Sequence, residues 1–390
     1  MEKTWRWFGR KDKVSLEMLR QIGVEGIVTA LHDEPVGAVW TVEKINEMKA
    51  YIESFGLRWS VVESLPVSEQ IKYAGPDRDR LIENYKISLA NLGKCGIKTI
   101  CYNFMPVIDW VRTELEHPMP DGTLSLYFDY ARFAYFDMKI LGRKDAEKDF
   151  PADVVAKVED LDKIIAEEEK QQLIDTIITK TQGFVNGPLG DAAGSPVAKF
   201  KELMRPYEGM TKDGLRANMK YFLEAVMPVC DEYDINMCVH PDDPPMPVFG
   251  MPRLVCNADD IRWFLGAVDN FHNGLTFCAG SLSAGAHNDV VAMAREFAPR
   301  THFVHMRSCD LLSGGDFVEA PHVGSKVNLV DLVEIFEDTG RNLPMRVDHG
   351  KTMLGDEKVG YNPGYTFHGR MLALGQVEGM MAAVRHLKQR

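Results

Sequence analysis

The chain has 390 residues, of which 45% are hydrophobic and 26% charged, and its formal net charge is −12. This balance is typical of a soluble globular protein, and the negative charge argues against a nucleic-acid-binding surface. No apolar run is long enough to cross a membrane, and the first residues do not form a signal peptide. The seven scattered cysteines suit a reducing compartment better than a disulfide framework, so a cytoplasmic location is expected.

Eight short β-branched or apolar runs alternate with helical patterns along the chain, which predicts an α/β protein with a (β/α)₈ TIM barrel. The predicted strands cover residues 4–8, 26–30, 58–63, 98–103, 235–240, 275–279, 302–307 and 345–348. The clearest helices cover residues 41–55, 81–92, 215–233, 261–268, 290–297 and 329–336. Thr41 and Asn257 are the expected N-caps of two helices, because short polar side chains accept hydrogen bonds from free N–H groups.

The fourth and fifth predicted strands are separated by far more chain than one helix requires. We therefore expect one barrel domain over residues 1–390 with a long helical insertion at residues 110–210. Within it, residues 144–180 are charged and helical in pattern, while residues 186–196 are rich in glycine and proline and predict a loop. Such an insertion lies on the catalytic face of a barrel, so it is expected to be a lid or the contact of a homodimer. A solvated helical hairpin with no role in chemistry is the alternative.

Ligand-type side chains end four consecutive predicted strands. His240 precedes the proline-rich run Pro241–Pro245, which restricts the backbone around it, and Cys278, His305 and Asp348 follow at later strand ends. Singly, each is more often structural, because a buried cysteine usually behaves as a small hydrophobe. Together they predict one metal site, since a barrel gathers its strand ends around one axis. This donor set favours zinc by chemistry alone, and its imidazoles and carboxylate also suit manganese and iron.

Strand pleating chooses between the two histidines of the seventh strand. Side chains at i and i+3 lie on opposite faces, so His302 and His305 point in opposite directions. His305 lies nearer the carboxyl end of its strand, where barrel sites are built, and is the better ligand candidate. Two rival ligands stay open. Cys238 shares the face of His240 one layer deeper, and Glu63 ends the third strand.

The sequence resembles the mannonate dehydratases of hexuronate catabolism from end to end. The matching segments are Arg6–Gly9, Val28–His32, Tyr102–Val107 with Asp109-Trp110 and Arg112-Thr113, His240–Pro245, Cys278 with Gly280-Ser281, Phe303–His305 with Arg307, Asp348–Gly350, and Pro363–Tyr365 with Gly369-Arg370. Each segment alone is a weak signal, whereas so many in the same order are specific. Val347 and Ser308 stand where the family commonly has proline and asparagine, which bears on substrate preference more than on the reaction.

The resemblance implies dehydration of D-mannonate to 2-dehydro-3-deoxy-D-gluconate on a xylose-isomerase-like barrel. It also implies a divalent cofactor, usually Mn²⁺ with Fe²⁺ or Co²⁺ as alternatives, held by the four strand-end residues selected above. Residues matching His349 and Tyr365 are implied as the acid/base pair, and Arg307 as a partner for substrate charge or hydroxyl groups. A His349 that only supports the metal ligand beside it, and a Tyr365 that only packs at the barrel rim, are the structural alternatives.

Four further residues are candidates for substrate contacts: Asn103, Arg112, His32 and Trp7. His32 ends the second predicted strand, where a hydrogen-bonding role is expected, and Trp7 either faces the sugar or fills the bottom layer of the barrel. The expected partner is a small sugar acid, with no nucleic acid and no membrane.

The residue types suit this reaction. The C2 proton of mannonate is hardly acidic, because its removal adds negative charge to an anion, and a divalent cation would offset that charge. The leaving C3 hydroxide needs a proton donor, for which histidine and tyrosine are reasonable. Our sequence-based hypothesis places Tyr365 at C2 and His349 at the leaving group. A sugar isomerase on the same barrel, or a non-catalytic sugar-acid-binding protein with a structural metal, are the alternative functions.

Overall fold

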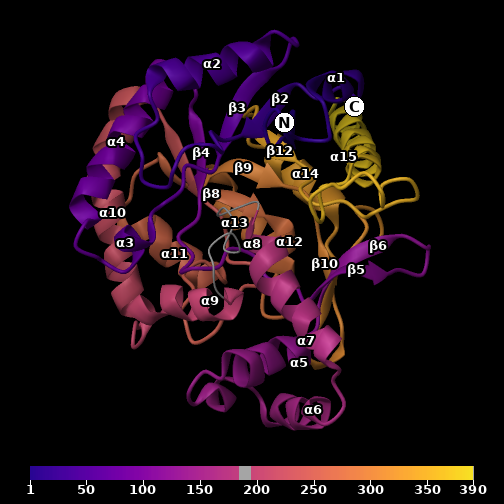
Figure 1. The fold of residues 1–390 in the computed structure, drawn as a ribbon. Helices are drawn as coiled ribbons and strands as arrows, with labels where there is room; N and C mark the ends of the chain where they lie inside the picture. Colours follow the sequence, from indigo (N-terminus) through magenta and orange to yellow (C-terminus); the bar gives the residue numbers. More distant parts are fainter. Residues whose placement is uncertain (184–194, 390) are drawn as a thin grey trace.

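Eight parallel strands close into a barrel at the centre of the computed structural model, which describes residues 1–183 and 195–389 (Figure 1). The strands are β1 (Glu2–Arg6), β2 (Gly26–Thr29), β3 (Arg58–Glu63), β4 (Thr99–Tyr102), β7 (Asn236–Val239), β8 (Asn273–Cys278), β9 (Thr301–His305) and β12 (Pro344–Arg346). β1 pairs in parallel with both β2 and β12, which closes the ring. The predicted (β/α)₈ barrel and its eight strands are confirmed.

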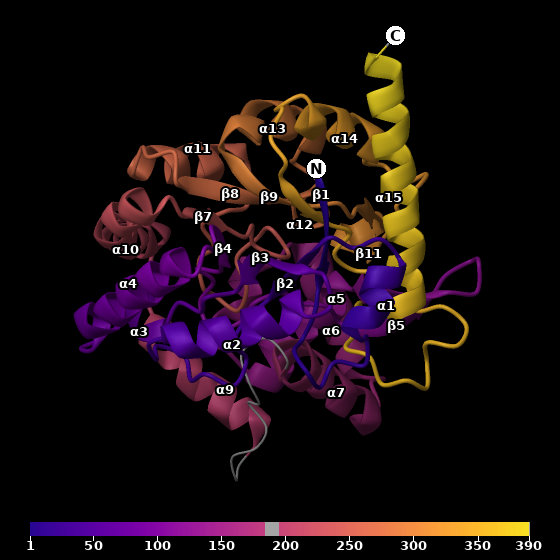
Figure 2. The same ribbon diagram turned by 90° about the horizontal axis from the view of Figure 1, so that it is seen from above.

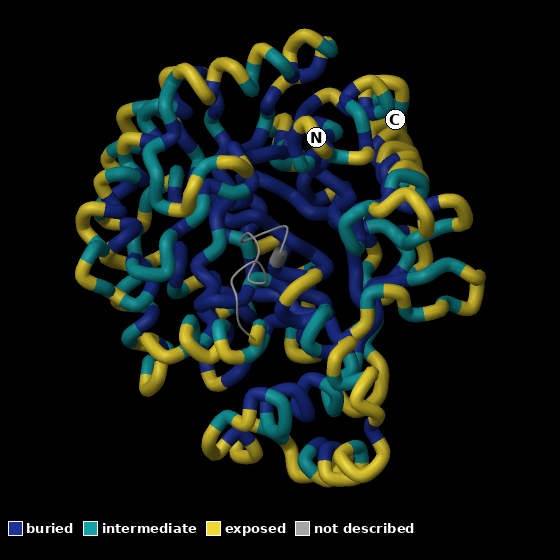
Figure 3. Tube along the Cα trace, viewed as in Figure 1, coloured by how far each residue is buried: buried dark blue, intermediate teal, exposed yellow. Residues whose placement is uncertain are grey.

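Helices surround the barrel. They are α1 (Leu16–Gln21), α2 (Val42–Glu53), α3 (Glu69–Lys72), α4 (Arg78–Lys94), α10 (Lys212–Tyr233), α11 (Ala258–Ala267), α12 (Ala279–Ser283), α13 (Val290–Phe297), α14 (Leu329–Glu337) and α15 (Phe367–Lys388). Both predicted caps are present, since the side chains of Thr41 and Asn257 accept hydrogen bonds from the N–H groups of Lys44 and Asp260. Buried residues fill the ring and the inner faces of the helices, while exposed residues lie outside (Figure 3). Among the described residues, no helix is both long and apolar enough to span a membrane.

In its described residues, the insertion between β4 and β7 contains helices and a β-hairpin. Its elements are β5 (Glu114–Pro118), β6 (Leu124–Phe128), α5 (Tyr130–Tyr135), a π-helix (Phe136–Leu141), a 3₁₀ turn (Ala146–Asp149), α6 (Ala152–Asp162), α7 (Glu167–Ile174), a second π-helix (Asp175–Lys180), α8 (Thr181–Gly183), α9 (Pro196–Met204) and a second 3₁₀ turn (Arg205–Tyr207). The hairpin was not among the predicted elements. Figure 2 shows α6, α7 and α9 together on one side of the barrel. Most of the loop predicted at residues 186–196 lies outside the described residues.

A second sheet lies outside the barrel. The connection after β9 supplies β10 (Cys309–Leu311) and β11 (Phe317–Glu319), which join the hairpin of the insertion in the antiparallel order β10-β11-β6-β5. We call these four strands the accessory sheet. It links two segments that are far apart in the sequence and lie on the same end of the barrel as the strand-end residues.

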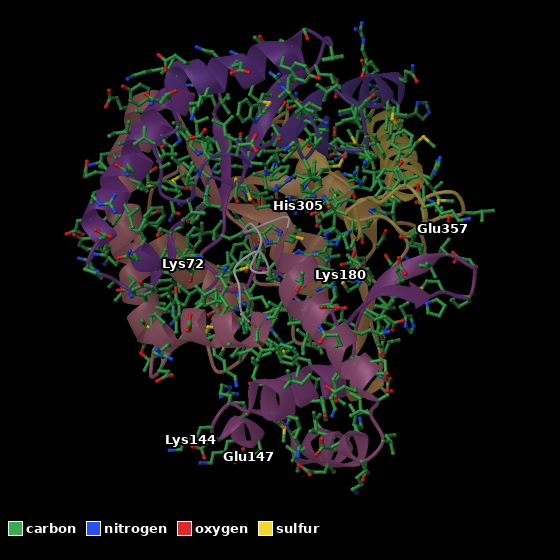
Figure 4. All side chains as sticks on the ribbon, viewed as in Figure 1. Lys72, Lys144, Glu147, Lys180, His305 and Glu357 are labelled. Carbon is green, nitrogen blue, oxygen red and sulfur yellow. The ribbon has the colours of Figure 1, made fainter. Side chains whose placement is uncertain are left out.

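The two histidines of β9 occupy different environments. His305 is fully buried, and Figure 4 places it at the centre of the ring, far from Lys144 and Glu147 at the outer end of the insertion. His302 bonds through its Nε2 to the carbonyl oxygen of Phe271, at 2.8 Å. Burial lowers the pKa of His302 to about 4. The alternation expected from the pleat is therefore observed.

Acid should destabilise the fold through His302. In the unfolded chain a histidine has a pKa of about 6.5, whereas the folded protein holds His302 near 4. As the pH falls through this window, the unfolded state takes up a proton that the folded state resists, so the free energy of unfolding decreases. His302→Gln should make that decrease smaller, as measured by urea unfolding at several pH values, and the exposed His386→Gln controls for loss of a histidine. An equally steep decrease in His302→Gln would contradict this.

Candidate active site

A polar pocket opens at the carboxyl ends of the barrel strands, with an empty volume of about 490 Å³. It is lined by Arg6, Phe8, Glu63, Ser64, Asn103, Asp109, Trp110, His240, Asp243, Arg307, Arg346, Asp348, His349 and Tyr365. Six of the predicted site residues are in this lining, and two more, Cys278 and His305, are grouped with His240. The charged and hydrogen-bonding walls suit a small polar molecule.

Three of the predicted metal ligands converge. Donor atoms of His240, Cys278 and His305 all lie within 4.8 Å of one another, and His240 Nε2 is 3.3 Å from His305 Nδ1. His240 Nδ1 lies 2.7 Å from the carbonyl oxygen of Pro241. When Nδ1 donates its proton to that carbonyl, the lone pair of Nε2 faces the other donors, which is the arrangement of a metal-binding histidine.

Asp348 completes the set of donors. Its Oδ2 is 3.5 Å from His305 Nδ1 and 3.6 Å from Cys278 Sγ. Its backbone φ is +63°, an uncommon conformation for a residue with a side chain, and such strain clusters at functional sites. Arg346 and Arg307 each approach the carboxylate to 2.5 Å. Burial opposes ionisation of Asp348, but these charges hold its pKa well below the ordinary value.

The surroundings of the Cys278 sulfur favour its thiolate form. It accepts hydrogen bonds from Ser281 Oγ at 3.1 Å and from the Ser281 N–H at 3.5 Å. Burial opposes the charge, yet Arg307 and His240 hold the pKa of Cys278 well below the usual range. Gly280 is needed beside it, because a Cβ there would lie 2.2 Å from the Arg307 guanidinium. The three converging donors, with the Asp348 carboxylate next to two of them, form a set of sulfur, nitrogen and oxygen ligands that fits a divalent metal ion.

The two alternative metal ligands, Cys238 and Glu63, lie outside the group of converging donors. Cys238 lies in the layer below, in a cluster inside the barrel, and its Sγ is 3.5 Å from the carbonyl oxygen of Ile100. Glu63 lies beside His305, with its Oε1 3.6 Å from Nε2 of that ring, while Arg346 and Arg6 pair with the carboxylate. Glu63 therefore supports the side of His305 that faces away from the other donors.

His349 and Tyr365 meet at the pocket wall. Their rings contact edge to face with centroids 5.0 Å apart, and Phe8 packs against Tyr365 in the same manner at 4.8 Å. Gly364 has φ +78°, and a Cβ there would lie 3.0 Å from His349 Cγ. Only glycine permits this approach without strain. Burial raises the pKa of Tyr365 to about 12, so its phenol is protonated at neutral pH.

The two predicted arginines are engaged with buried acids. Arg112 has no exposed surface and pairs with Asp243 at 2.7 Å and Glu319 at 2.7 Å, so it lies behind the wall of the pocket. Arg307 lines the pocket, but it pairs with Asp243 at 2.6 Å and with the Asp348 carboxylate. Arg112 therefore supports the pocket wall from behind, whereas Arg307 is part of the wall and is paired with acids there.

Trp7 and His32 are not in the pocket lining. Trp7 donates from Nε1 to the carbonyl of Val14 at 3.1 Å, and His32 lies 3.5 Å from Thr29 Oγ1. Burial lowers the pKa of His32 to about 3. Neither geometry supports a direct substrate contact, because both side chains are occupied elsewhere. Asn103 does line the pocket.

Several further residues belong to the site and were not among the predicted ones. Asp109 accepts a hydrogen bond from Asn103 at 2.6 Å, and Arg6 and Arg346 line the pocket. Glu319 bonds to His349 Nδ1, with its two oxygens at 2.8 and 2.9 Å. Face alternation along β1 could have identified Arg6, and along β12 it does place Arg346 on the face of Asp348. No strand-end signal marks Glu319, since it lies in the accessory sheet.

The whole chain, residues 1–390, matches the family model described as D-mannonate dehydratase (UxuA). A relative named mannonate dehydratase from Marinomonas sp. (strain MWYL1) is 43% identical over 390 residues, covering 97% of this chain and 98% of the relative. Another from Chromohalobacter salexigens is 41% identical over 400 residues, covering 99% of this chain and all of the relative.

Solved structures agree with these matches. The crystal structure of mannonate dehydratase from Streptococcus suis serotype 2 has a TM-score of 0.80 and 32% identity, covering 100% of this chain and 96% of that one. A D-tagatose 3-epimerase-like protein has a TM-score of 0.50 at 9% identity, with 99% of each chain covered, and shows the fold alone. The chain belongs to the D-mannonate dehydratase family.

Proposed function

We propose that this protein dehydrates D-mannonate to 2-dehydro-3-deoxy-D-gluconate with a divalent metal ion. The observation that carries the proposal is the convergence of His240, Cys278 and His305. Asp348 lies next to His305, and the His349–Tyr365 pair lines the adjoining polar pocket. Mn²⁺ is the first candidate, with Fe²⁺ and Co²⁺ as alternatives. When bound, the ion would supply Lewis-acid stabilisation of the negative charge that develops as the C2 proton leaves.

Arginines on the pocket wall provide the attraction for an anionic substrate. Arg6, Arg307 and Arg346 all line the pocket. Among the described residues, the Nε of Arg6 is buried without a hydrogen-bond partner, which leaves a donor for the substrate carboxylate. On the wall formed by the β4 end, Asn103 and Asp109 offer donors and acceptors for hydroxyl groups. These residues would bind and orient the sugar acid.

The roles of His349 and Tyr365 in proton transfer are assigned from the hydrogen-bond partner of His349 and from the pKa of Tyr365. His349 has its Nδ1 next to the Glu319 carboxylate, so its Nε2 can take the C2 proton. Tyr365 carries a proton at neutral pH and can give it to the departing C3 hydroxide, which leaves as water. The resulting enol then becomes the 2-keto product, and the two residues exchange protons with solvent. This is the reverse of the sequence-based hypothesis, which used neither the partner of His349 nor the pKa of Tyr365.

The proposed reaction is tested by the mass of the product. Incubation of the metal-loaded protein with D-mannonate should give a 2-keto acid whose mass is lower than that of the substrate by one water. Mass spectrometry measures the mass, and a carbonyl assay detects the new ketone. A sugar isomerase would instead convert an aldose such as D-mannose into a product of unchanged mass. Isomerisation of the aldose with no reaction of D-mannonate would contradict the proposal.

We also propose that the insertion between β4 and β7 helps to form the wall of the active site. Gln182 of α8 accepts a hydrogen bond from the N–H of Asp109 at 2.9 Å and donates to the carbonyl of Trp110 at 2.9 Å. Asp109 and Trp110 both line the pocket, so α8 fixes one wall. This contact favours a role in substrate binding over a solvated hairpin. The homodimer and the cytoplasmic location remain predictions. Analytical ultracentrifugation would measure the oligomeric state.

A further inference from the structure

The accessory sheet ends beside His349. Glu319 is the last residue of β11, and its carboxylate is buried with both oxygens close to His349 Nδ1, at 2.8 and 2.9 Å. A carboxylate can only accept hydrogen bonds, so His349 must donate from Nδ1. The neutral ring then has its lone pair on Nε2, and one ring orientation is selected.

Glu319 is itself held from three sides. Nη2 of Arg112 pairs with its Oε1 at 2.7 Å, and Nη1 of Arg307 lies 3.5 Å from the same oxygen. Its backbone carbonyl accepts a hydrogen bond from Ser125 Oγ of β6 at 2.7 Å. Arg112 also pairs with Asp243, which pairs with Arg307 in turn. The carboxylate is therefore rigidly placed by a buried network of ion pairs and hydrogen bonds, to which the insertion and the connection after β9 both contribute.

We propose that Glu319 is a positioning residue that fixes the tautomer and the orientation of His349, and that Arg112 holds Glu319 in place for this role. The inference rests on the proposed function, in which His349 transfers a proton. A carboxylate beside one ring nitrogen is the general means by which proteins set which nitrogen of a histidine reacts. It gives the accessory sheet a part in catalysis and gives Arg112 a role other than substrate contact.

The kinetic test is Glu319→Gln in the metal-loaded enzyme. The amide can donate to Nδ1, which favours a proton on Nε2 and removes the lone pair from the reacting nitrogen. We expect kcat to fall by about 10²- to 10⁴-fold. KM for D-mannonate and the bound metal per chain should change by less than about twofold, because the lost interaction acts in the transition state. Glu319→Asp, which keeps the carboxylate, should recover part of the lost kcat.

Glu114 supplies a matched control on the same sheet. Its Oε2 lies 2.9 Å from His117 Nδ1, in an exposed pair that does not line the pocket of His349. Glu114→Gln makes the same chemical change to a Glu–His pair and should keep the kcat of the unsubstituted enzyme. If Glu319→Gln also keeps that kcat, or loses activity only in proportion to lost metal, the inference is overturned.

A second readout does not depend on turnover. Nitrogen-15 NMR of histidine-labelled protein loaded with Mg²⁺, which is not paramagnetic, reports which ring nitrogen of His349 carries the proton. We expect Nδ1 in the original protein and Nε2 in Glu319→Gln. A proton on Nε2 of the original protein would overturn the inference even if D-mannonate is dehydrated. Absence of dehydration with the proton on Nδ1 would instead reject the proposed function and leave the positioning by Glu319 supported.

Discussion

Replacing His305 by alanine should remove the metal from the protein and lower kcat by at least about a thousandfold. The side chain is fully buried at the centre of the barrel and lies 3.3 Å from the facing His240 nitrogen, so its removal takes one nitrogen donor out of the cluster. A Lewis acid contributes several kcal/mol to the stabilisation of a developing charge, and about 4 kcal/mol corresponds to about a thousandfold in rate. Metal content is measured by elemental analysis of dialysed protein, and kcat at saturating D-mannonate.

His302→Ala is the matched control, because it removes a buried histidine from the same strand on the opposite face. Its Nε2 bonds to the carbonyl of Phe271, away from the donor cluster. This variant should lose some stability and keep both its metal and its kcat. Equal losses of metal in the two variants would mean that damage to β9, and not removal of a ligand, explains the effect of His305→Ala.

Tyr365→Phe should lower the rate of dehydration by about 10²- to 10⁴-fold while leaving proton exchange at C2 in place. The hydroxyl that it removes is held protonated by burial, which raises the pKa of Tyr365 to about 12. Without that donor the C3 hydroxide leaves poorly, but His349 can still remove and return the C2 proton. NMR of D-mannonate in heavy water measures the exchange of the C2 proton for deuterium, which is the step that should persist in this variant.

Tyr361→Phe controls for loss of a tyrosine hydroxyl from the same loop. Tyr361 is half-buried and lines a separate, larger cavity with Asn362 and Pro363, so its removal should leave both rates unchanged. If Tyr365→Phe loses C2 exchange together with dehydration, Tyr365 is the base at C2. The assignment then returns to the one that the sequence alone favoured.

The barrel and the four donor residues were predictable because both follow from short-range patterns. Parallel strands are buried on both faces and appear as apolar runs, as in Gly26–Thr29 and Thr99–Tyr102. Ligand-type residues at consecutive strand ends must converge in a closed ring. The same alternation applied to Arg6, Trp7 and Phe8 would have placed the first and third on the pocket side and Trp7 on the other, as the structure shows.

The accessory sheet and its contribution to the site were not predicted, for different reasons. The hairpin has a recognisable signal, since Asp121-Gly122 joins two alternating strands. β10 and β11 have three residues each, too few for a periodic pattern. The position of Arg112 behind the wall depends on Asp243 and Glu319, which are distant in the sequence. Such long-range ionic partners can only be identified from the fold.

The most direct test of the account is a metal titration of chelator-stripped protein in the presence of D-mannonate. Formation of 2-dehydro-3-deoxy-D-gluconate should be absent without metal, rise in proportion to added Mn²⁺, and level off at one ion per chain. Full activity in the stripped protein, or a fully loaded protein that forms no product, would contradict the assignment of His240, Cys278, His305 and Asp348 as the catalytic metal site.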